Sequence, residues 1–177
     1  ALPLREEEWG TFALAHARFV LEHVPDPQAV VEGMMRAVRP GGRIVLEDDD
    51  HDVLRLWPEP PGVRQVWEAY CRSYDRLGNE PYVGRRLVEL LHAAGAQPRR
   101  NTWIFFGACQ GQPTFAALAV NMFKILEGAR ETVLSHKLLD PRYYDAGLEA
   151  LEAWRHRPDA ALWYAISWAE GIRPLVS

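Results

Sequence analysis

The stretch that decides the fold is FALAHARFVLEHVPDPQAVVEGMMRAVRPGGRIVLEDDDHD, residues 12–52. It reads as an apolar strand at Phe12–Ala17, a polar turn through His23, a helix at Pro27–Val38 and a second strand at Arg43–Glu47. The second strand runs into residues 47–52, which we call the acidic tip. Strand, helix and strand within about forty residues form a βαβ unit, which predicts parallel strands with the helix on one face of the sheet.

The helix of this unit has clear ends. Asp26 can cap its first turn, and Pro27 suits the first helical position because the missing N–H would have no partner there. Apolar residues recur at helical spacing from Val30 to Val38, and the sequence Pro-Gly-Gly at 40–42 ends the pattern. Ligands of such sheets bind beyond the carboxyl ends of the strands, so residues 16–23 and the acidic tip are the informative segments.

The rest of the chain continues the alternation of helices and strands. Three prolines between residues 53 and 62 predict an extended connection. Apolar periodicity and β-forming residues predict the following elements: helices at Val63–Leu77 and Val83–Ala94, a strand at Asn101–Cys109, helices at Pro113–Leu126, Thr132–Leu139 and Pro141–Trp154, and a last strand at Ala161–Ala169. The fold class is therefore α/β with about four strands.

Composition narrows the classes of function. A chain of 177 residues with a net charge of −4 and a pI near 5.9 offers no electrostatic attraction for nucleic acid or an anionic membrane. No apolar run has the length of a membrane-spanning helix, so we expect a cytoplasmic protein. Cys71 and Cys109 lack metal-ligand spacing and are expected to be buried thiols.

A resemblance to a family covers nearly the whole chain and is most specific over residues 16–42. The segments 12–27 and 38–47, with the sequences FALAHARFVLEHVPDP and VRPGGRIVLE, resemble the second half of class I S-adenosylmethionine-dependent methyltransferases, in the branch that acts on small molecules and quinones. The resemblance implies a partial Rossmann-like sheet, mostly parallel with an antiparallel last strand. It implies one truncated domain over 1–177, made of a βαβαβ part at 1–112, a helical insertion at 113–156 and the final strand at 157–177.

The resemblance also implies S-adenosylmethionine as cofactor and methyl transfer to a small molecule. The family holds this cofactor mainly with a glycine-rich loop after its first strand, and no such G-x-G pattern occurs in this sequence. The methyl transfer then depends on a missing N-terminal half or on a partner that completes the cofactor site. In the family order, the strand Phe12–Ala17 loses its neighbour, which predicts a homodimer that pairs this strand across a two-fold axis.

Candidate site residues follow from their place in the unit. Four of the candidates, His16, Arg18, Glu22 and His23, follow the first strand. In the family this segment lines the space between cofactor and acceptor, so these residues are candidates for acceptor orientation or proton handling. Alternatively, their role is structural: Arg18 and Glu22 pair with each other, and His23 caps the start of the helix. The acidic tip and the later helices add pocket-lining candidates, although aromatic residues at helical spacing also suit a core. The candidates are His16, Arg18, Glu22, His23, Asp48, His51, Tyr74 and Arg85.

The acidic tip has a second interpretation. Oxygen-rich clusters after a strand suit Mg²⁺ or Mn²⁺, and Asp48 and Asp50 are the candidate ligands. Alternatively, these carboxylates repel one another and face solvent. Three hypotheses about function remain open: a methyltransferase completed by a cofactor-binding half, a non-catalytic dimer that binds a small ligand, and a metal-dependent transferase that uses the acidic tip.

Overall fold

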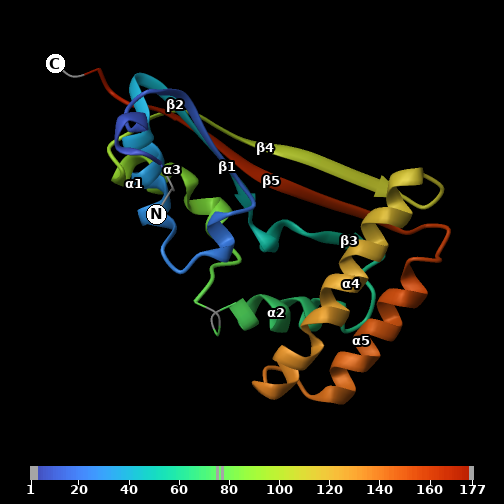
Figure 1. Ribbon diagram of the computed structural model, residues 1–177. Helices are drawn as coiled ribbons and strands as arrows, with labels where there is room; N and C mark the ends of the chain where they lie inside the picture. Colours follow the sequence, from blue (N-terminus) through green and yellow to red (C-terminus); the bar gives the residue numbers. More distant parts are fainter. Residues whose placement is uncertain (1–3, 75, 77, 176–177) are drawn as a thin grey trace. The chain divides into compact units, whose positions relative to one another are not determined.

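The computed structural model describes residues 4–74, 76 and 78–175. Within this part the chain forms α-helices (α), strands (β) and short 3-10 helices (η). Figure 1 labels the α-helices and the strands. In chain order they are η1 (Glu6–Glu8), β1 (Phe12–Arg18), η2 (Leu21–His23), α1 (Pro27–Ala37), β2 (Val38–Asp49), η3 (His51–Val53), β3 (Arg55–Trp57), α2 (Val63–Tyr74), η4 (Val83–Arg86), α3 (Leu87–Ala93), β4 (Gln97–Cys109), α4 (Pro113–Ser135), α5 (Pro141–Trp154) and β5 (Ala161–Ile172).

The chain divides into two compact units. Unit 1 comprises Ala1–Asp52, Gly78–Ile104 and Ala165–Ser177, and unit 2 comprises Val53–Leu77 and Phe105–Tyr164. The strands β4 and β5 continue from one unit into the other. The single domain with a helical insertion stays a prediction.

Unit 1 contains the βαβ unit expected from the sequence. β1 pairs in parallel with β2, so that His16 lies beside Val45 and Arg18 beside Glu47. β2 also pairs with β5 in the antiparallel direction, with Val45 beside Glu170. The parallel pair and the antiparallel last strand are therefore both confirmed.

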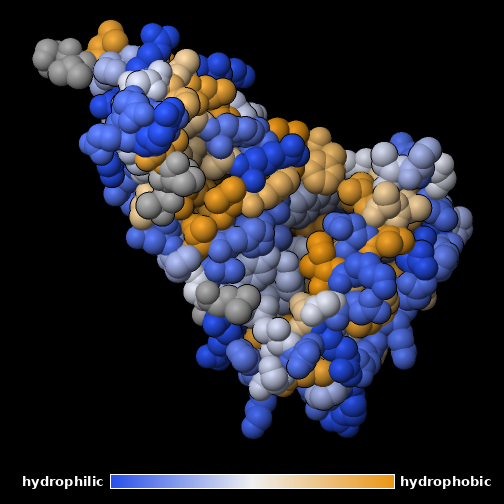
Figure 2. Space-filling view, viewed as in Figure 1, coloured by the Kyte–Doolittle hydropathy of each residue, from blue (hydrophilic) through white to orange (hydrophobic). Residues whose placement is uncertain are grey.

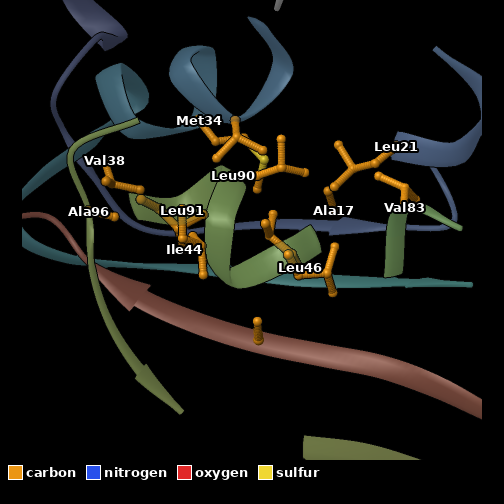
Figure 3. Packing of buried hydrophobic residues seen from close by; sticks show 13 residues of the cluster. Ala17, Leu21, Met34, Val38, Ile44, Leu46, Val83, Leu90, Leu91 and Ala96 are labelled. Carbon is orange, nitrogen blue, oxygen red and sulfur yellow. The ribbon is translucent and has the colours of Figure 1, made fainter. Parts of the chain in front are cut away.

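The core of unit 1 lies between two helices and the sheet. Figure 3 shows Met34 of α1 and Leu90 and Leu91 of α3 packing over Ile44 and Leu46 of β2. The side chains of all five residues are almost completely buried. Helix α1 starts as predicted, because the carboxylate of Asp26 accepts a hydrogen bond of 3.0 Å from the backbone N–H of Ala29.

Unit 2 contains α2, α4, α5 and the short strand β3. β3 pairs with the start of β5, with Arg55 beside Trp163. It lies within the predicted extended connection and raises the strand count in the described part of the chain to five. Helices α4 and α5 meet at Phe115 and Trp154, whose ring centroids are 5.5 Å apart.

Other elements differ from the sequence predictions in their details. The helix predicted from Val83 starts as η4, in which Gly84 lies against the backbone of the acidic tip. The end of the helix predicted at Val63–Leu77 reaches residues 75 and 77, which lie outside the described residues. The two patterns expected after Pro113 form the continuous helix α4 up to Ser135. Among the described helices, none is long and apolar enough to cross a membrane.

The cysteine prediction is half right. Cys71 is buried in α2, as expected, whereas Cys109 is exposed at the end of β4. The prediction for Cys109 is wrong because most of β4 is exposed along its length, so the apolar residues around Cys109 do not indicate a core position.

Tyr144 makes the stability of unit 2 decrease at alkaline pH. Its hydroxyl donates a 2.6 Å hydrogen bond to the carbonyl of Leu126, and burial raises the pKa of Tyr144 to about 12. An unfolded tyrosine has a pKa of about 10. Because the pKa is higher in the folded state, the stabilisation is complete below about pH 10 and is lost between about pH 10 and pH 12. We expect the urea midpoint to fall over this range, and to fall less in Tyr144→Phe; equal losses in both proteins would contradict this assignment.

Candidate functional site

The candidate site lies in unit 1, at the carboxyl ends of β1 and β2. The chain leaves β1 through Phe19, whose backbone has a φ of 53° and whose N–H donates to the carbonyl of Glu47 at 3.0 Å. A left-handed backbone is unusual for an aromatic residue, and here it turns the chain sharply toward the acidic tip. The polar segments that follow β1 and β2 therefore meet at one edge of the sheet.

Asp48 holds these two segments together. Its side chain is fully buried, and Oδ2 accepts hydrogen bonds from the backbone N–H groups of Val20 at 3.1 Å and Leu21 at 2.8 Å. Oδ1 accepts from the N–H of Asp49 at 3.1 Å. Burial raises the pKa of Asp48, the nearby charge of Glu22 adds to the increase, and the three backbone donors oppose it. Asp48 thus organises the backbone of the site.

Glu22 lies between two histidines. Its carboxylate is almost completely buried; Oε2 lies 3.1 Å from Nε2 of His51, and Oε1 lies 3.3 Å from Nε2 of His23. The side chain of His51 is 7% exposed, whereas that of His23 is 55% exposed. The buried carboxylate therefore orients one accessible imidazole and one buried imidazole, and the accessible one can exchange a proton with a bound molecule.

Arg85 binds two carboxylates of the acidic tip. Its guanidinium binds Asp50 in a bidentate fashion, with N···O distances of 2.8 and 2.7 Å, and reaches Asp52 at 3.3 Å. These hydrogen bonds raise the pKa of Arg85 further above its ordinary value. The ring of Tyr82 lies under the guanidinium, 4.9 Å away. Arg85 therefore offsets the charge of two carboxylates of the tip.

His16 and Arg18 form a second polar group around Glu47. Nε2 of His16 lies 3.2 Å from Oε1 of Glu47, and Nε of Arg18 lies 3.4 Å from Oε2. The side chain of His16 is 42% exposed. The side chains of these three residues stand on neighbouring strands, because the parallel register places Arg18 beside Glu47.

The structure brings most of the sequence candidates together. Seven of the eight lie in unit 1, around the ends of β1 and β2: His16, Arg18, Glu22, His23, Asp48, His51 and Arg85. Tyr74 belongs to unit 2, where its hydroxyl lies 2.7 Å from that of Tyr70. The structural alternative is wrong in both of its contacts, because Arg18 pairs with Glu47 instead of Glu22, and Asp26 instead of His23 caps α1.

Sequence reasoning did not single out Glu47 and Asp49. Both belong to the acidic tip, and both are half-buried, whereas Asp48 between them is buried. Side chains alternate between the two faces of a strand, so Glu47 and Asp49 lie on the opposite face from Asp48. The sequence could have indicated this only if the second strand had been predicted to continue to Asp49.

The donor atoms of three residues could hold a metal ion. Glu22, Asp49 and His51 each offer one ligand atom, and these atoms lie within 4.8 Å of one another. Asp48 and Asp50, the ligands considered from the sequence, are instead engaged by backbone N–H groups and by Arg85.

Known proteins share sequence with the chain. The model of a family described as a methyltransferase domain matches residues 4–100. Methyltransferase Str2 from Strobilurus tenacellus is 28% identical over 126 residues, which cover 69% of this chain and 46% of that protein. Methyltransferase Str3 from the same organism is 31% identical over 90 residues, or 49% of this chain and 32% of that protein. The chain spans less than half the length of these curated relatives.

A solved structure shares the fold. It is a protein from Bacillus halodurans assigned as a methyltransferase, with a TM-score of 0.54 and 15% sequence identity, and the match covers 98% of this chain and 68% of that one. The family match covers more than half of the chain and includes both segments that meet at the candidate site. The chain belongs to the methyltransferase-domain family.

Proposed function

We propose that the protein takes part in S-adenosylmethionine-dependent methylation of a small molecule, and that this chain supplies residues for the acceptor. The observation that carries the proposal is the gathering of His16, His23 and Glu22 at the carboxyl ends of two parallel strands in a methyltransferase-family chain. Ligands of such sheets bind at this edge.

The chain's own residues suit an acceptor that loses a proton. The imidazoles of His16 and His23 are both accessible, and each lies beside a carboxylate, at 3.2 Å from Glu47 and 3.3 Å from Glu22. An imidazole held in this way can take a proton from a hydroxyl or amine as its lone pair forms a new bond. The carboxylates orient the rings and stabilise the imidazolium that results.

The described residues do not form a matching binding site for the cofactor. A glycine turn that could approach ribose and carboxylate closely should follow a strand, at its carboxyl end. Gly41, with a φ of 76°, lies near the opposite end of β2, and its N–H already donates to the carbonyl of Arg173 at 2.9 Å. We therefore restrict the proposal for this chain to acceptor binding and proton transfer.

The test titrates the purified chain with small phenols and amines while NMR follows the ring protons of His16 and His23. We expect saturable shifts of both rings with at least one of these acceptor classes, and at least about 10-fold weaker binding in His23→Ala, which is about 1.4 kcal/mol. His156→Ala, at an exposed histidine of unit 2, is the matched control and should bind as the parent does. S-adenosylhomocysteine should not bind below about 1 mM, because the described residues offer it no matching site. If no phenol or amine shifts either ring up to about 10 mM, the proposal fails.

We also propose that β1 pairs with a second copy of the chain. Within the described residues β1 has one strand neighbour, β2, and Phe12 and Leu14 expose 38% and 48% of their surface. Figure 2 shows hydrophobic side chains at the surface among hydrophilic ones in this region. Antiparallel pairing centred on Ala15 would place Phe12 opposite Arg18 and Leu14 opposite His16, which are compatible neighbours.

Sedimentation analysis of the chain tests this proposal. We expect a dimer at micromolar concentration, and we expect Leu14→Lys to yield a monomer, because a lysine on an edge strand opposes pairing. Val120→Lys, on the exposed surface of α4, is the matched control and should remain dimeric. A monomeric parent chain would refute the pairing.

A further inference from the structure

Glu22, Asp49 and His51 form a mixed nitrogen and oxygen donor set. Their ligand atoms lie within 4.8 Å of one another, and Nε2 of His51 is 3.1 Å from Oε2 of Glu22. Ligands about 2.1 Å from a six-coordinate ion are about 3.0 Å apart when adjacent and about 4.2 Å apart when opposite. The pair of Glu22 and His51 already has the spacing of adjacent ligands, and the other spacings in the set, which are within 4.8 Å, would shorten around an ion.

Backbone contacts hold two of these donors in place. The carbonyl of Glu22 accepts a hydrogen bond from the N–H of Glu80 at 3.2 Å, and the N–H of His51 donates to the carbonyl of Pro81 at 3.1 Å. Asp49 is the last residue of β2 and is paired with Ile166 of β5. The three donors thus come from ordered segments, which lowers the cost of assembling a site.

The charges around the donor set favour a cation. The carboxylate of Glu22 is almost completely buried, and the fully buried carboxylate of Asp48 is close enough to influence it. The two arginines at the acidic tip are bound to other carboxylates, Arg85 to Asp50 and Asp52 and Arg18 to Glu47. A buried carboxylate is costly unless it is paired and hydrogen-bonded, and a bound divalent ion would supply the positive charge of such a pair.

We propose that Glu22, Asp49 and His51 bind one divalent first-row transition-metal ion, such as Mn²⁺ or Zn²⁺. The imidazole nitrogen favours such an ion over Mg²⁺ or Ca²⁺, which prefer oxygen ligands alone. Three protein ligands leave coordination positions for water or for the oxygen of a bound molecule. This proposal goes beyond methyl transfer and does not depend on it.

The test is a titration of the EDTA-treated, dialysed chain with MnCl₂, in which electron paramagnetic resonance measures free Mn²⁺. We expect one ion per chain with a Kd in the micromolar range, and we expect Zn²⁺ to displace it because Zn²⁺ binds nitrogen ligands more tightly. His51→Ala and Asp49→Asn should each weaken binding at least about 10-fold. Asp52→Asn, a nearby exposed carboxylate outside the donor set, should bind as the parent does.

Metal-free thermal unfolding separates loss of the site from loss of the fold. Glu22→Gln keeps the shape of the side chain and removes its charge, so it tests the site even if His51→Ala does not fold. Binding that is lost in a variant that still unfolds cooperatively supports the proposal. No binding up to about 1 mM of either ion overturns it, and so does equal affinity in Glu22→Gln, Asp49→Asn and the parent chain. None of these results depends on S-adenosylhomocysteine.

Discussion

Asp48→Ala is expected to lower the free energy of unfolding by about 3 kcal/mol or more, the largest effect of any single exchange at the site. The truncation removes the acceptor of three backbone hydrogen bonds, from the N–H groups of Val20, Leu21 and Asp49. Leu21 is itself fully buried, so water cannot replace the lost acceptor there. Urea unfolding of the parent and variant, followed by circular dichroism, measures the difference.

Asp48→Asn separates hydrogen bonding from charge. The amide oxygen can keep the two bonds from Val20 and Leu21, while the amide nitrogen would face the N–H of Asp49. The exchange also removes a buried charge near Glu22. We therefore expect a smaller loss than in Asp48→Ala. Asp52→Ala, at a side chain that is 65% exposed, is the control and should change stability by less than about 0.5 kcal/mol. An Asp48→Ala loss no larger than this would refute the anchoring function of Asp48.

Gly84→Ala is expected to cost about 2 to 3 kcal/mol. A Cβ at this position would lie 2.7 Å from the carbonyl oxygen of Asp49 and 2.8 Å from that of Asp48. Both contacts are with backbone, so no side chain can rotate away and η4 must move from the acidic tip. We therefore also expect the bond between Arg85 and Asp50 to weaken, because Arg85 follows Gly84 directly.

Gly128→Ala is the matched control for this exchange. Gly128 lies inside α4, and a Cβ there would meet nothing within 4 Å. Alanine is the better helix former by about 0.5 to 1 kcal/mol, so this variant should be more stable than the parent. Chemical unfolding of both variants measures the difference in their free energies of unfolding. A Gly84→Ala variant that is as stable as Gly128→Ala would show that η4 does not pack closely against the acidic tip.

The elements of unit 1 could be predicted well because their signals are local. Asp26 and Pro27 mark the start of α1 by the physical requirements of a helix end, and the structure shows the expected bond from Asp26 to Ala29. The parallel pairing of β1 and β2 follows from the crossover helix. The short strand β3 was not predicted, because three residues directly before Pro58 carry too little periodicity and depend on β5 for pairing.

The candidate site could be located from the sequence, but the contacts within it could not. Asp48, Asp49 and Asp50 are chemically identical neighbours, but their contacts differ. Asp48 accepts hydrogen bonds from backbone N–H groups, Asp49 belongs to the donor set with Glu22 and His51, and Asp50 binds Arg85. These differences arise from the turn at Phe19 and from the approach of residues 80–85, which are non-local. Glu47 likewise gains its partners only from the register of β1 on β2.

The assembly of unit 2 from residues 53–77 and 105–164 restricts how such a protein can be recombined with its relatives. No continuous gene fragment encodes unit 2 without also encoding residues 78–104 of unit 1. An exchange of unit 2 between homologues needs two separate transferred segments and therefore four crossover points, two of which fall inside β4 and β5. Because these two crossovers fall within hydrogen-bonded strands, chimaeras will tolerate them only where both parents share the same strand register.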